Sequence, residues 1–127
     1  MSRLWLLPED VLAIHFDQVE RYGGAPEIRD MGQLQAALFR PQTGYYKDLI
    51  EEAAALWESL SQNHPFMDGN KRTAFAAIFV FLQINGLDIT ATAPATWKFL
   101  SRLYDRGDMD FQQLEKWLRK NTAPIKD

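Results

Sequence analysis

Apolar residues recur at three- and four-residue spacing over six segments of the chain, which predicts a mostly helical protein. Pro8 can occupy a first helical turn, and the repeat after it ends at the glycines of residues 23–24. Asp30, Asp48 and Asp110 each precede a repeat and have Gln or Glu three residues later, as in a capping box. The expected helices cover about residues 8–22, 31–39, 49–62, 71–84, 93–104 and 111–118.

The fourth expected helix is apolar nearly all round, with Asn70 as its plausible N-cap. Its apolar part, residues 73–84, is well short of the ~20 residues that span a bilayer, so it predicts a buried helix. Residues 40–47 suit a loop or a small hairpin, and residues 87–90 are extended at most briefly. We therefore expect an all-α bundle of about six helices around a central buried helix, with a small flap hairpin at most.

Length and composition predict one soluble domain over residues 1–127, with its core at about 7–120. The chain contains no cysteine, which excludes disulfides and thiolate chemistry. Its formal net charge of −3 makes a nucleic acid a poor default partner. Residues 1–7 lead directly into Pro8 and two acidic residues, so we expect no signal peptide, no membrane association and a cytoplasmic protein.

The segment His64–Thr73 carries the candidate chemistry between two expected helices. Histidine titrates near neutral pH, so His64 could act as general base for a hydroxyl that attacks a phosphate. Asp68 offers a carboxylate to Mg²⁺, and Gly69 allows backbone amides to approach a ligand closely. Lys71 and Arg72 could bind phosphate oxygens, because cations at a helix N-terminus oppose the helix dipole unless an anion is bound there. The pattern predicts a nucleotide site.

Structural roles are the alternatives for the same residues. His64 could simply end a helix, Asp68 could cap the next one, and Lys71 and Arg72 could be solvated first-turn residues. The segment is not a Walker A loop, since it lacks the G-x-x-x-x-G-K-[ST] pattern. His15 has no acidic or histidine partner at ligand spacing, so we interpret it as structural.

The run His64–Arg72 resembles the motif of the Fic/Doc (Fido) superfamily, and Lys71 is similar to the Doc, or death-on-curing, branch of toxins. Further similarity lies outside the motif and extends the resemblance over about residues 7–118. It is found at Arg21–Gly24, Ile28–Asp30, Arg40–Gln42 and Asn85–Gly86.

This resemblance implies ATP and Mg²⁺ as cofactors. It implies that His64 activates a target hydroxyl and that Asp68 holds the metal ion. Lys71 and Arg72 would share in catalysis by gripping the phosphates. The nucleotide-binding set that the resemblance implies also includes Phe66, as the anchor of the loop, and residues Gly69 and Asn70.

Fic enzymes that transfer AMP normally have glycine where this chain has Lys71. The resemblance to Doc toxins implies that ATP lies in the reverse sense, with its γ-phosphate toward His64, and that the protein is a kinase. It further implies a threonine of elongation factor Tu as target, blocked translation, and neutralisation by a Phd-type antitoxin, since the inhibitory [ST]-x-x-x-E-[GN] pattern is absent. An AMP transferase and a non-catalytic binding module of a toxin–antitoxin complex are the alternatives.

Overall fold

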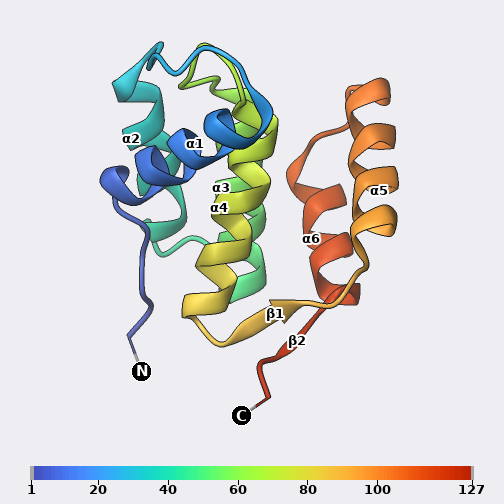
Figure 1. Ribbon diagram of the computed structural model, residues 1–127. Helices are drawn as coiled ribbons and strands as arrows, with labels where there is room; N and C mark the ends of the chain where they lie inside the picture. The colour runs from blue at the N-terminus through green and yellow to red at the C-terminus, as the bar shows by residue number, and fades with distance from the viewer. Residues whose placement is uncertain (1, 127) are drawn as a thin grey trace.

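A computed structural model describes residues 2–126 of the chain as a helical bundle with one small pair of strands (Figure 1). The expected all-α fold is confirmed. Within the described residues no helix combines the length and the apolar composition that crossing a membrane requires. The elements in chain order are α1 (Pro8–Tyr22), α2 (Met31–Phe39), the 3-10 helix η1 (Arg40–Gln42), α3 (Leu49–Gln62), α4 (Asn70–Ile84), β1 (Leu87–Ile89), α5 (Ala93–Arg106), α6 (Phe111–Lys120) and β2 (Thr122–Pro124).

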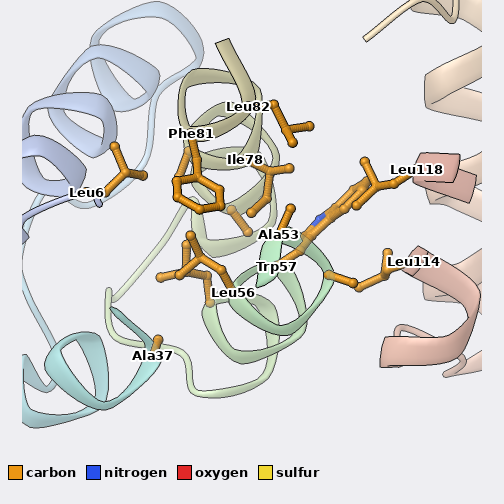
Figure 2. Packing of buried hydrophobic residues seen from close by; sticks show 14 of the residues in the cluster. Leu6, Ala37, Ala53, Leu56, Trp57, Ile78, Phe81, Leu82, Leu114 and Leu118 are labelled. Atoms are coloured by element: carbon orange, nitrogen blue, oxygen red, sulfur yellow. The ribbon is translucent and has the colours of Figure 1, made fainter. Parts of the chain in front are cut away.

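Helices α3 and α4 pack against each other at the centre of the bundle (Figure 1). Helix α1 lies across α4, and α6 packs on the other side of α3. Figure 2 shows Trp57 of α3 between Ile78 of α4 and Leu118 of α6, and all three side chains are fully buried. Helix α3 is the more enclosed of the two central helices, because α4 leaves Phe75 and Phe79 partly exposed on one face.

Four helices begin with a side chain that accepts a backbone N–H of the first turn, three of them at the predicted Asp30, Asp48 and Asp110. The capping residues are Asp30, Asp48, Thr92 and Asp110. Helix α4 is different, because Gly69 is its N-cap at φ +77° and no side chain caps it. The prediction that Asn70 caps this helix is wrong. Its amide instead bonds both the N–H and the carbonyl of Phe66, four residues earlier.

Residues 40–47 form the 3-10 helix η1 and a loop, so the loop alternative holds and the hairpin does not form. Arg40 ties this segment to α3 by donating to Glu58 at 2.7 Å and to Ser59 at 2.9 Å. The short extended stretch after α4 is confirmed as β1. It pairs antiparallel with β2, a strand that the sequence did not predict, with Leu87 opposite Pro124.

Candidate active site

The loop of residues 64–69 joins α3 to α4 at the top of the bundle in Figure 1, where it lies against the segment between α1 and α2. Backbone hydrogen bonds hold the two together. Met67 donates to the carbonyl of Glu27 at 3.1 Å, and Arg29 and Asp30 both donate to the carbonyl of Pro65 at 2.8 and 3.0 Å. The loop is therefore held by residues 27–30 as well as by the two helices that it connects.

Phe66 anchors this loop in the core, as the resemblance implied. Its side chain is 1% exposed, and its ring stacks on the imidazole of His15 with the ring centroids 3.8 Å apart. His15 is itself buried, and its Nε2 lies 2.8 Å from the carbonyl oxygen of Asp68, which confirms its structural role. A side chain as enclosed as Phe66 can affect a ligand only through the position of the loop.

His64 has an unusual backbone conformation, with φ +49°. A non-glycine residue rarely adopts a positive φ, and the following Pro65 disfavours the right-handed helical region at this position. Arg29 stabilises the bend, because its guanidinium donates to the carbonyls of His64 at 2.5 Å and Asn63 at 2.7 Å. The bend leaves the His64 side chain exposed, where it can reach a ligand.

Asp68 presents a carboxylate that is only partly engaged. Its Oδ2 accepts the N–H of Ala25 at 2.9 Å, which leaves Oδ1 without a hydrogen bond to any residue in the range 2–126. Gly24 permits this approach, since a Cβ at that position would lie 3.1 Å from the Cβ of Asp68. The described residues hold no cluster of three or more His, Asp or Glu that could bind a metal ion. One oriented carboxylate suits Mg²⁺ that is held mainly by nucleotide phosphates.

The two cations of the motif each lie over a tyrosine ring. Lys71 Nζ is 4.3 Å from the ring centroid of Tyr104 in α5, and the guanidinium carbon of Arg72 is 5.2 Å from that of Tyr22 in α1. Arg72 also donates to the carbonyl of Gly23 at 3.1 Å. Within the described part of the chain, neither cation forms an ion pair with a carboxylate. Both charges are therefore available to an anion.

The N-terminus of α4 adds a positive electrostatic contribution at the same place. Its first backbone N–H groups have no capping side chain, and its first turn contains no acidic residue. Free N–H groups and the helix dipole together favour a bound anion, such as a phosphate. The Nε of Arg72 is also buried without a hydrogen-bond partner in the described structure. A phosphate oxygen would supply an acceptor for the free N–H groups of the first turn.

A cleft of about 1480 Å³ opens between α4 and α5 and collects these groups. His64, Asp68 and Lys71 line the cleft close to the start of α4, and Phe79 and Trp97 add apolar lining. The structure thus brings together every predicted site residue except the buried Phe66. The predicted residues that line the cleft are His64, Asp68, Gly69, Asn70, Lys71 and Arg72. An apolar wall beside a cationic end suits a nucleotide, which has a base and a phosphate tail.

A sequence model of the Fic/DOC family matches residues 5–82, which include the whole motif, helices α1 to α3 and all but the last two residues of α4. The chain belongs to the Fic/Doc family. The helix α5, which forms the opposite wall of the cleft, lies beyond the matched residues.

This chain is similar to two proteins named Doc. The Toxin Doc of Mycolicibacterium smegmatis is 51% identical over 75 residues, which cover 55% of this chain and 58% of that protein. The Protein kinase doc of Escherichia phage P1 is 36% identical over 86 residues, which cover 65% of this chain and 68% of that protein. The chain thus spans between about half and two thirds of the length of these relatives.

Three residues that shape the site were not predicted from the sequence to do so. Arg29 entered only as part of the resemblance, and the contact of Arg29 with the carbonyl of His64 joins residues 35 positions apart. Tyr22 and Tyr104 were given no role in the site, and their rings lie over Arg72 and Lys71. Local sequence pattern carries little information on such contacts, because they depend on how distant helices pack.

Proposed function

We propose that this protein is a Doc-type toxin kinase that transfers the γ-phosphate of ATP to a hydroxyl of a target protein. The observation that supports the proposal is that His64, Asp68 and Lys71 line one cleft, beside the uncapped N-terminus of α4. The names of the two relatives, a toxin and a protein kinase, support the same reading. Lys71 distinguishes phosphoryl transfer from AMP transfer, because it occupies space that a glycine would leave open.

In the proposed reaction, His64 Nε2 or Nδ1 accepts the proton of the target hydroxyl as its oxygen attacks the γ-phosphorus. A new O–P bond forms, and the bond between the γ-phosphorus and its bridging oxygen breaks, so that ADP leaves. The held bend at His64 prepares this step, since Arg29 fixes the backbone carbonyl of that residue. General-base catalysis of this kind typically contributes about 10²–10⁴-fold to the rate.

Lys71, Arg72 and the N–H groups at the start of α4 would bind the phosphates and oppose their charge. Such donors contribute most when they are in place before the reaction. Asp68 would hold Mg²⁺ through Oδ1, and the ion would supply further charge neutralisation of the phosphates. Asn70 would act less directly, because its amide is engaged with the backbone of Phe66. Gly69 would let the phosphates approach the helix N-terminus.

For the partners, we propose a threonine of elongation factor Tu as the phosphorylated residue and a Phd-type antitoxin as the inhibitor, with the cytoplasm as the place of action. The support is the Doc-like motif with Lys71 and the similarity to a Toxin Doc. By resemblance to the flap region of Fic/Doc proteins, residues 40–47 would align the target segment. Their exposed Tyr45 gives this loop a side chain that could contact another protein.

The reaction can be tested by incubating the protein and purified elongation factor Tu with ATP labelled at either the α- or the γ-phosphate. We expect label on the target only from the γ position. His64→Ala should reduce the amount of label by about 10²-fold or more. Label from the α position alone would make the protein an AMP transferase. No label from either, together with growth arrest that His64→Ala leaves unchanged, would indicate a non-catalytic binding module.

Lys71→Gly refines the same experiment. If Lys71 determines which phosphate faces His64, this variant loses γ-phosphate transfer. If Lys71→Gly transfers the γ-phosphate at an unchanged rate, Lys71 does not determine which phosphate faces His64.

A further inference from the structure

The ammonium group of Lys71 extends from the first turn of α4 to the facing wall of the cleft. Its Nζ lies 4.3 Å from the ring centroid of Tyr104, within the ~6 Å range of a cation–π interaction. Tyr104 belongs to α5, which the family match does not reach. One residue of the motif is thus held by a part of the chain that carries no motif of its own.

An aromatic ring holds an ammonium group differently from a carboxylate. A carboxylate would neutralise the charge of Lys71 and would compete with phosphate oxygens for its N–H donors. The ring attracts the cation through its face and accepts no conventional hydrogen bond from it, so the donors stay free. Asp105 is next to Tyr104 and lines the same cleft, but Lys71 and Asp105 form no ion pair.

The ring of Tyr104 is half-buried in the wall of the cleft. Its hydroxyl is buried, and its helix is anchored by the buried side chains of Leu100 and Leu103. Burial raises the pKa of Tyr104 to about 12, with the neighbouring Ser61 hydroxyl opposing part of this shift. The phenol therefore stays neutral at physiological pH, and its contact with Lys71 is a cation–π interaction and not an ion pair.

Tyr104 also lies where two hollows of the surface meet. It lines the large cleft and a smaller pocket of about 390 Å³, and His64 and Lys71 line both of them as well. The ring is therefore close to the place where the proposed reaction would bring phosphate and target hydroxyl together. A shift of the Lys71 ammonium at this place would change the contacts of the reacting phosphate.

We propose that Tyr104 is a positioning residue, whose ring holds the Lys71 ammonium in place to bind nucleotide phosphates. The expected effect of Tyr104 on phosphate transfer rests on the proposed function. The contact itself predicts an effect on nucleotide binding, whichever phosphate is transferred.

The test compares Tyr104→Leu, which removes the ring, with Tyr104→Phe, which keeps it and removes only the hydroxyl. We expect Tyr104→Leu to raise the Kd for Mg²⁺ and a non-hydrolysable ATP analogue by about 2- to 30-fold, and Tyr104→Phe to change it less than about 2-fold. Titration calorimetry measures both. The thermal unfolding midpoint shows that each variant is folded, and Tyr104→Met serves as a second ring-free variant if Tyr104→Leu does not fold.

Lys71→Met separates positioning from general packing. In the Lys71→Met background, the ring-free substitution at Tyr104 should have no further effect on Kd, because the ammonium that the ring holds is already gone. An equal loss in Tyr104→Phe and Tyr104→Leu would overturn the proposal, as would a loss that persists without Lys71. Because binding needs no transfer, a nonzero coupling supports the proposal even if labelled ATP shows that the protein is not a kinase.

Discussion

The two sides of the cleft are built in different ways. The loop of residues 64–69 is held by backbone hydrogen bonds to residues 27–30 and by the buried ring of Phe66. The facing helix α5 is held mainly by apolar packing, as in the stacking of Phe99 on Trp117 of α6 at 5.0 Å. In Figure 1 α5 stands beside α6, away from the centre of the bundle. One side is fixed by directional bonds and the other by packing.

The reacting groups thus lie on the side fixed by hydrogen bonds, and the apolar lining of the cleft lies on the side fixed by packing. Reacting groups need positions that are accurate to a fraction of an ångström, and directional hydrogen bonds give such accuracy. An apolar wall needs only a suitable shape. Trp97 of α5, which lines this wall, is 64% exposed. We therefore expect substitutions behind the loop to damage both stability and transfer, and substitutions in the α5 wall to change mainly nucleotide binding.

Phe66→Ala should have the largest effect, because it removes the buried ring that anchors the loop. We expect the free energy of unfolding to fall by about 3–5 kcal/mol, as for other buried phenylalanines that are replaced by alanine. Urea denaturation measures this loss. The neighbouring Met67 is 56% exposed, and Met67→Ala should cost no more than about 0.5 kcal/mol. Similar losses in the two variants would mean that the ring of Phe66 does not anchor the loop.

Gly24→Ala tests whether the approach of residues 24–25 positions Asp68. Gly24 has φ +115°, and a Cβ there would lie 3.1 Å from the Cβ of Asp68. Gly86→Ala is the matched control, since Gly86 has φ +91° and no neighbouring atom within 4 Å of its Cβ position, and it lies outside both the cleft and residues 40–47. Both variants should lose about 1–2 kcal/mol from backbone strain. Only Gly24→Ala should also lower the transfer rate, by about 10-fold or more. An equal rate in the two variants would contradict this role.

The smallest expected effect concerns the attachment of α6 to α3 through Asp48 and Arg119. Burial raises the pKa of Asp48, but the N–H of Glu51 and the Arg119 guanidinium outweigh it and hold the pKa below its ordinary 3.8. A lowered pKa in the folded state stabilises the protein above the pKa of the unfolded state, and this contribution is lost as the pH falls through the folded value.

Asp48→Asn keeps an N-cap side chain and removes the charge. We expect it to reduce the free energy of unfolding near neutral pH by no more than about 1 kcal/mol, as is usual for exposed pairs. The difference from the wild type should shrink as the pH falls below 3.8. Denaturant titrations over a pH series would show it, and a difference that grows in acid would contradict the assignment.

The helices and most of their caps could be predicted from the sequence, because capping and apolar periodicity are local. Asp48 is an example, since its side chain accepts the N–H of Glu51 only three residues later. The prediction for Asn70 was wrong, because asparagine is equally suited to cap a helix and to bond the backbone of the preceding loop. The pairing of β2 with β1 was not predicted, since three-residue strands carry no periodic signal and their register depends on the packing of α6.

The candidate site was predictable in part for the same reason. Its motif residues are adjacent in the sequence, so their convergence on the start of α4 follows from one loop and one helix. The contacts of Arg29 with His64 and of Tyr104 with Lys71 join residues more than 30 positions apart. No local pattern distinguishes these side chains from other Arg and Tyr residues of the chain.

The central claim is that the motif presents the γ-phosphate of ATP to His64. A crystal structure of the protein with Mg²⁺ and a non-hydrolysable ATP analogue tests it most directly. We predict that the γ-phosphate lies nearest the His64 imidazole, with Lys71 and the N–H groups at the start of α4 on the phosphate tail. An α-phosphate nearest His64, or a nucleotide bound away from the start of α4, would contradict the claim.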